Sequence, residues 1–167
     1  MNLLQVPAGQ PIIIDANILI YANQLTSNQC VKLLERCSQN KVFGILPVHI
    51  LAEVMHILIL AEARDLGLVK GANPAKQLNE NPQKVRALYR YESLIRDLLA
   101  IGLQLEPLQR EDFLISMNLQ REYGLLTNDA LFIAVALRLR ITSVISADSA
   151  FKNIQGIIQY SPDDLVL

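Results

Sequence analysis

Two aspartates follow short apolar runs, at the positions where a buried β-strand would end. Asp15 comes directly after the run 12–14, and Asp148 follows the segment 144–147 in the same way. Ligands of open parallel sheets bind at the carboxyl ends of the strands, so two acids at strand ends would share one edge. Each could instead cap the helical turn that follows it, because Asp is a favoured N-cap residue. Finding the pattern twice favours a shared site.

Two further carboxylates interrupt or begin apolar helical segments. Glu53 lies within the apolar stretch 50–55 of a predicted helix, where an unpaired buried carboxylate costs several kcal/mol. We therefore expect an Arg partner, a bound proton or a metal ion to compensate it. Asp129 begins a helix whose next residues, 130–137, are all apolar. The helix dipole alone favours an acid there, so Asp129 is the least specific of the four signals.

Brought into one pocket, these four carboxylates would repel one another unless a divalent cation neutralised them. Mg²⁺ prefers carboxylate oxygens and usually keeps several waters. A metal ion held in this way can lower the pKa of a bound water and stabilise the charge that develops on a phosphate. The residue types therefore point to phosphodiester hydrolysis, and no Ser, Cys or His arrangement typical of a nucleophile competes with that chemistry.

The segments around the four acids resemble the signature blocks of PIN-domain ribonucleases, a class that includes the VapC-type toxins of toxin–antitoxin pairs. The blocks are residues 15–19, 51–54, 127–131 and 146–151, in the family's order. The resemblance implies a three-layer α/β/α fold with a mostly parallel sheet, Mg²⁺ or Mn²⁺ as cofactor and RNA as substrate. An antitoxin and a second copy of the chain are the protein partners that it implies.

The resemblance also implies roles for individual residues. The catalytic, metal-binding carboxylates would be Asp15, Glu53, Asp129 and Asp148. Polar side chains that orient the acids or a water would be Asn17, Asn128 and Ser146. A catalytically inactive PIN-like RNA-binding or scaffold protein is the main alternative, against which the presence of all four acids argues. A phosphotransfer receiver is disfavoured, because no Asp-x-Asp follows the first strand and no Lys stands near the start of the last one.

Strand-like and helix-like patterns alternate along the chain, which predicts an α/β fold with a mostly parallel sheet covered on both faces. We expect strands at 11–14, 42–46, 103–106, 142–146 and 156–160. We expect helices at 26–39, 47–65, 83–100, 110–123 and 129–139, the last capped by Asn128, and a helical turn at 149–152. The Gly-, Asn- and Pro-rich segment 66–82 is expected to be a loop.

No linker divides the 167 residues, so we expect a single domain spanning 1–167, with a middle segment at about 66–100 that is longer than in compact VapC toxins. A chain that is 51% apolar with a net charge of -1 is neither disordered nor coated in basic residues. No run approaches the roughly 20 apolar residues of a membrane span, and no signal peptide is visible. Cys30 and Cys37 would lie about 10 Å apart on one helix, too far for a disulfide. We therefore expect buried thiols and a cytoplasmic protein.

Seven basic residues lie between positions 64 and 96. Arg86 and Arg90 are one helical turn apart in the expected helix, with Tyr89 and Tyr91 beside them. Phosphate pairing and base stacking by such residues suit a single-stranded nucleic acid, which makes the two arginines candidate RNA contacts. A solvated helix face is the simpler interpretation, and one arginine could instead pair with the acids of the site.

A second metal motif can be set aside. His49, Glu53 and His56 share one helix face, and residues 53–56 spell the Glu-x-x-His of di-iron bundles. Such sites need two of these motifs and two further glutamates, whereas the chain holds only two histidines. We expect His56 to be a core or interface residue.

Overall fold

The isoleucine run that was predicted as the first strand lies at the centre of the sheet in a computed structural model that describes residues 1–166. Five strands form the sheet in the order β3-β2-β1-β4-β5, and every neighbouring pair is parallel. They are β1 (Pro11–Ile14), β2 (Phe43–Pro47), β3 (Gln104–Glu106), β4 (Ser143–Ile145) and β5 (Ile158–Tyr160). Ile13 of β1 pairs with Ile45 on one side and Val144 on the other, and β1 is buried from Ile12 to Ile14.

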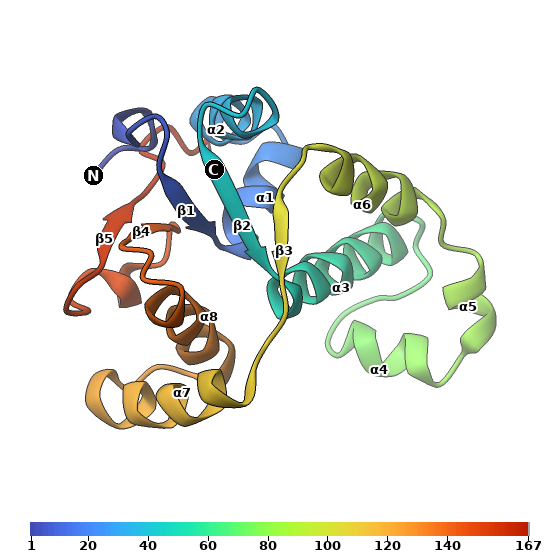
Figure 1. Ribbon diagram of the computed structural model, residues 1–167. Helices are drawn as coiled ribbons and strands as arrows, with labels where there is room; N and C mark the ends of the chain where they lie inside the picture. The colour runs from blue at the N-terminus through green and yellow to red at the C-terminus, as the bar shows by residue number, and fades with distance from the viewer. Residues whose placement is uncertain (167) are drawn as a thin grey trace.

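Helices connect the strands and flank the sheet, which confirms the predicted α/β fold (Figure 1). They are α1 (Ala16–Asn23), α2 (Asn28–Ser38), α3 (Val48–Asp65), α4 (Pro74–Asn79), α5 (Pro82–Arg86), α6 (Arg90–Ala100), α7 (Arg110–Tyr123) and α8 (Thr127–Arg138), with 3-10 helices at Leu3–Gln5 and Ser149–Phe151. Figure 1 shows α7 and α8 together at one end of the molecule, and α3 and α6 toward the other. Ser27 caps α2 and Gly124, at φ 71°, ends α7, both where the sequence indicated a helix boundary.

The middle of the chain differs from prediction in two places. α4 lies inside the expected loop 66–82, where Pro74 takes the first helical position after the left-handed Asn73. The helix expected at 83–100 is instead two helices, α5 and α6. The break at residues 87–89 leaves the first amide groups of α6 free to bind Glu62 of α3. In Figure 1, α4 and α5 lie beyond α3, on the side away from the sheet.

α3 carries apolar residues on most of its sides because it packs against two separate hydrophobic cores. Ile50, Val54 and Leu58 are buried in the main core around the sheet. Near the other end of the helix, Ala63 joins a second cluster with the buried residues Val69, Leu78 and Leu88. α3 is therefore a central helix between the sheet and the middle segment.

Three smaller expectations have clear outcomes. Cys30 and Cys37 are buried free thiols, as predicted. His56 is exposed on α3, so its placement in the core is wrong. Within residues 1–166, none of the helices combines the length and the apolarity that crossing a membrane requires.

Candidate active site at the carboxyl edge of the sheet

The carboxyl ends of β1, β2 and β4 lie side by side, because these strands are neighbours and parallel. Asp15 follows β1 directly, and its N–H donates a 3.0 Å hydrogen bond to the Ile145 carbonyl at the end of β4. Asp148 comes three residues after β4, and Glu53 lies in the second turn of the helix that follows β2. Asp15, Asp148 and Glu53 thus lie in the segments that follow the three central strands of the sheet.

Asp15 is held by a network that joins the ends of β1 and β4. Its Oδ1 accepts the N–H of Ala16 at 2.7 Å, so Asp15 is also the N-cap of α1. Its Oδ2 accepts the Asn17 amide and the Ser146 hydroxyl, both at 2.6 Å. Asn17 also bonds Ser146 Oγ at 3.1 Å and accepts the N–H of Ala147 at 3.1 Å. Asn17 and Ser146 therefore fix the orientation of the Asp15 carboxylate.

The electrostatics tie Asp15, Glu53, Asp129 and Asp148 together. Burial, with smaller contributions from the charges of Glu53 and Asp129, raises the pKa of Asp15 to about 6 against the hydrogen bonds from Ser146 and Ala16. Burial also raises the pKa of Asp129, with the charges of Asp148 and Glu53 adding to the effect. The charge of Glu53 thus acts on both Asp15 and Asp129, and the charge of Asp148 acts on Asp129.

Glu53 and Asn128 contact each other across 75 residues of sequence. The Asn128 amide donates a 3.1 Å hydrogen bond to Glu53 Oε2. Two expectations are corrected by this arrangement. Leu126 is the N-cap residue of α8, so Asn128 lies inside the helix and does not cap it. Glu53 is only partly buried, because Ala52 and His56 on its side of α3 are exposed.

The turn that carries Asp148 is anchored from β5. Asp148 caps the 3-10 helix Ser149–Phe151 by accepting the N–H of Ala150 at 2.8 Å, and its own N–H donates to Ser146 Oγ at 3.0 Å. The Gln159 amide donates to the carbonyls of Ser146 and Asp148, at 2.8 and 2.7 Å. Sequence reasoning missed Gln159, since its partner groups are backbone atoms.

Comparison with known proteins assigns the family. Residues 12–157 match the family model described as the PIN domain. The chain belongs to the PIN-domain family. No curated protein matches the chain.

Two solved structures share the fold of this PIN domain. One is the VapBC2 complex of Rickettsia felis bound to a DNA fragment from their promoter, with 16% identity and a TM-score of 0.57 over 92% of this chain and 99% of that chain. The other is a toxin–antitoxin complex from Klebsiella pneumoniae, with 18% identity and a TM-score of 0.54 over 88% of this chain and 95% of that chain.

The oxygen donors of this PIN domain suit a hard divalent cation. Within residues 1–166, no three carboxylate, histidine or cysteine side chains are already arranged to hold a metal ion. Mg²⁺ does not require such a cage, because it is usually bound by one or two carboxylates and keeps several waters. Burial first, and the charges of Glu53 and Asp129 after it, raise the pKa of Asp15, and a cation would oppose both effects by favouring the ionised carboxylate. The donor set therefore fits Mg²⁺ or Mn²⁺.

The two arginines expected on one helix face lie on separate helices of the PIN domain. Arg86 ends α5 and is exposed, whereas Arg90 begins α6 and forms an ion pair with Asp65 of α3. Arg90 is thus the arginine that pairs with an acid, although Asp65 is not one of the four site residues. The prediction of one shared face is wrong, and RNA contact by either arginine stays a prediction.

Two polar clusters escaped the sequence analysis. Buried Glu62 accepts the N–H groups of Tyr89, Arg90 and Tyr91 at 2.9–3.0 Å. Arg138 of α8, whose side chain is 10% exposed, bonds Asp112 at 2.7 Å and Glu106 at 2.9 Å. No local pattern marks these residues, because each partner is at least 26 residues away along the chain.

Proposed function

We propose that this PIN domain is a Mg²⁺- or Mn²⁺-dependent endoribonuclease that hydrolyses RNA phosphodiester bonds. The observation that carries the proposal is the gathering of Asp15, Glu53, Asp129 and Asp148 at one sheet edge, with the pKa of Asp15 raised to about 6. Without a cation the mutual repulsion of these carboxylates would lower the stability of the fold, and a bound divalent ion would remove that cost.

The roles of the residues follow from their contacts. Asp15, Glu53, Asp129 and Asp148 would hold the metal ion, which when bound supplies an acidified water and charge stabilisation for the phosphate. Asn17 and Ser146 keep Oδ2 of Asp15 in one orientation, at 2.6 Å from each donor. Asn128 does the same for Glu53 at 3.1 Å. Fixed ligands need no reorganisation when a phosphate arrives.

Cleavage of a mixed RNA pool with Mn²⁺ tests the enzyme against the scaffold alternative. Asp15→Asn, Glu53→Gln and Asp148→Asn remove one charge each at constant size, and all three should abolish cleavage. Glu111→Gln is the matched control, because Glu111 is an exposed acid in the first turn of α7, and it should cleave like the wild type. A metal-bound wild type that cleaves no RNA would favour the scaffold alternative. Charge-removing variants that still cleave RNA would refute the four-carboxylate site.

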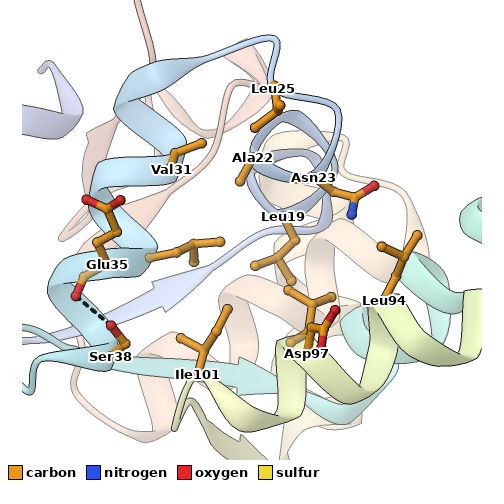
Figure 2. Close-up of a pocket in the computed structure, with 12 residues that line it drawn as sticks. Leu19, Ala22, Asn23, Leu25, Val31, Glu35, Ser38, Leu94, Asp97 and Ile101 are labelled. Carbon is orange, nitrogen blue, oxygen red and sulfur yellow. Dashed lines mark hydrogen bonds between the residues drawn. The ribbon is translucent and has the colours of Figure 1, made fainter.

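An antitoxin is the protein partner that we propose, since the two similar structures are VapBC and toxin–antitoxin complexes. The chain offers an apolar groove of about 310 Å³ between α1, α2 and α6. Figure 2 shows Leu19 and Ala22 of α1, Val31 of α2 and Leu94 of α6 around it. Glu35 and Asp97 stand at its rim, so the complementary occupant is an amphipathic segment with apolar residues and flanking Lys or Arg.

Co-expression with the product of the adjacent open reading frame tests the groove. Leu94→Glu should prevent co-purification, because it places a charge against apolar side chains. Leu66→Glu is the control, since Leu66 is an exposed apolar residue at the end of α3 and lies outside the groove. Equal co-purification of both variants would place the antitoxin elsewhere.

A homodimer and a cytoplasmic location complete the proposal. α7 exposes a run of apolar side chains, with Phe113 at 48%, Leu114 at 53% and Met117 at 46%, which a second copy could cover. The reduced thiols Cys30 and Cys37 suit a reducing compartment. Light scattering of the wild type and Leu114→Glu checks the dimer, which the variant should dissociate.

A further inference from the structure

His49 is a partly buried histidine whose two ring nitrogens make no hydrogen bond. It is the second residue of α3, one turn before Glu53, so the two side chains lie on the same face of the helix. Both Nδ1 and Nε2 are enclosed and lack a partner among residues 1–166. A buried polar group without a partner costs free energy that an apolar residue of similar size would avoid. The imidazole therefore needs an explanation beyond packing.

The surroundings of His49 limit which groups can form hydrogen bonds with its ring nitrogens. Burial lowers the pKa of His49, against opposing effects of the nearby Asn128 backbone and of the Glu53 and Asp112 carboxylates. The ring is therefore neutral at neutral pH, with one N–H donor and one acceptor. Asp112 is committed elsewhere, because it accepts Arg138 at 2.7 Å and the Gln109 N–H at 2.7 Å. Glu53 acts on the ring through its charge, so the neighbouring group that is placed to accept a hydrogen bond from the ring is the backbone of Asn128.

Asn128 connects this ring to the proposed active site. Its side chain donates to Glu53 Oε2 at 3.1 Å, while its backbone lies beside His49 without a hydrogen bond of normal geometry. Glu53 and His49 are both on α3, and Asn128 is in the first turn of α8. A small approach of α8 to α3 would close the contact between the ring and the Asn128 carbonyl.

We propose that His49 is a positioning residue whose ring N–H donates to the Asn128 carbonyl. This bond would keep the Asn128 side-chain amide oriented toward Glu53 when a divalent cation and RNA occupy the acidic edge of the sheet. His49 does not touch the reacting atoms. It acts through Asn128 on the orientation of one carboxylate. Its effect on turnover rests on the proposed ribonuclease activity, whereas its effect on the Asn128 amide does not.

The test compares three variants at the two histidines. His49→Leu removes both nitrogens at similar volume, His49→Gln keeps an N–H donor, and His56→Leu is the matched control on the exposed part of the same helix. We expect His49→Leu to fold and to lower kcat for RNA at least tenfold with little change in KM. His49→Gln should recover most of the loss, and His56→Leu should match the wild type.

Nuclear magnetic resonance supplies a readout that needs no catalysis. In His49→Leu the Asn128 side-chain amide signals should move toward their positions in Glu53→Gln, and in His49→Gln they should stay near those of the wild type. In His56→Leu the single remaining imidazole is that of His49, and its protonated nitrogen should exchange more slowly at saturating Mg²⁺, which is diamagnetic, than in the metal-free protein. Unchanged Asn128 signals in His49→Leu would overturn the proposal even if RNA is cleaved. Shifted signals without any RNA cleavage would leave it standing and refute the ribonuclease assignment alone.

Discussion

The Ser146 hydroxyl donates a 2.6 Å hydrogen bond to Oδ2 of Asp15, across 131 residues of sequence. The bond joins the ends of two adjacent parallel strands, and Ser146 is fully buried. It favours the ionised carboxylate, yet burial prevails and the pKa of Asp15 rises to about 6. The carboxyl of Asp15 therefore keeps its proton up to a higher pH than an ordinary aspartate does.

The first prediction is a pH-dependent cost of ionised Asp15. The folded chain holds this proton more tightly than the unfolded chain, so the contribution is complete below about pH 4 and is lost as pH rises through about 6. The free energy of unfolding of the wild type, relative to Asp15→Asn, should fall by up to about 3 kcal/mol across that window. Urea unfolding in EDTA at several pH values measures the difference.

The same experiment with saturating Mn²⁺ is its control. A bound cation favours the charged carboxylate, so the fall should shrink or vanish for the wild type. Parallel stability curves for wild type and Asp15→Asn in EDTA would contradict the proposed strain at Asp15.

The second prediction concerns the hydrogen bonds that Glu62 of α3 accepts from the backbone N–H groups at the start of α6, here called the Glu62 clamp. Burial alone would raise the pKa of Glu62, but the N–H donors of residues 89–91 outweigh it and the pKa is lowered. Glu62→Gln keeps an acceptor but loses the charge at a helix N-terminus, and should cost about 1–3 kcal/mol at pH 7. Hydrogen exchange should show the amides of Tyr89–Tyr91 opening before those of β1.

The control for the Glu62 clamp is Glu92→Gln. Glu92 is an exposed acid in the first turn of α6, so its replacement should change stability little. The contribution of Glu62 is present above its unfolded pKa of about 4.5 and is lost as pH falls through its lower folded value. Equal losses in the free energy of unfolding for Glu62→Gln and Glu92→Gln would show that the hydrogen bonds of Glu62 do not stabilise the fold.

The third prediction concerns the buried ion pairs of Arg138. Its guanidinium bonds Asp112, whose side chain is 0% exposed, and Glu106, whose side chain is 11% exposed. Arg138→Met would leave two buried carboxylates without a cation, and should cost about 3–5 kcal/mol. Arg121→Met, on the exposed last turn of α7, is the control and should stay within about 0.5 kcal/mol of wild type. Thermal unfolding in which both variants lose equally would contradict the prediction.

The sequence predicted the parts of the site whose cause is local. Asp15 and Asp148 follow apolar runs, and a parallel sheet brings the ends of such runs to one edge whatever lies between them. Glu53 was expected to be buried because the residues around it are apolar, but Ala52 and His56 turned out to be exposed. An apolar residue predicts burial only on average, and the outward side of α3 at this edge is an exception.

The break between α5 and α6 could not be predicted for a different reason. The segment 83–100 has helical periodicity throughout, so its local preference is for one helix. The break depends on Glu62, 27 residues before Tyr89, which accepts amide groups that a continuous helix would have used internally. Glu62 resembles an ordinary surface acid in sequence because Arg64 and Asp65 follow it. Its partner is set by the tertiary fold alone.

The last prediction separates the two arginines of the middle segment. Arg86 is exposed at the end of α5, whereas Arg90 is engaged with Asp65 beside the Glu62 clamp. If Arg86 contacts a phosphate, Arg86→Gln should weaken RNA binding and flatten the slope of log affinity against log salt by about 0.7, the value for one single-strand contact. Arg90→Gln should affect stability more than the slope, because it breaks a contact with α3.

Lys76→Gln is the control, since Lys76 is exposed on α4 and paired with Glu80 at 3.7 Å. Fluorescence anisotropy with a labelled RNA at several salt concentrations measures all three slopes, using the inactive Asp15→Asn background so that the RNA stays intact. An Arg86→Gln slope equal to that of Lys76→Gln would assign the basic side chains of the middle segment to solvation, and RNA would then have to be held by other surfaces near the acidic edge.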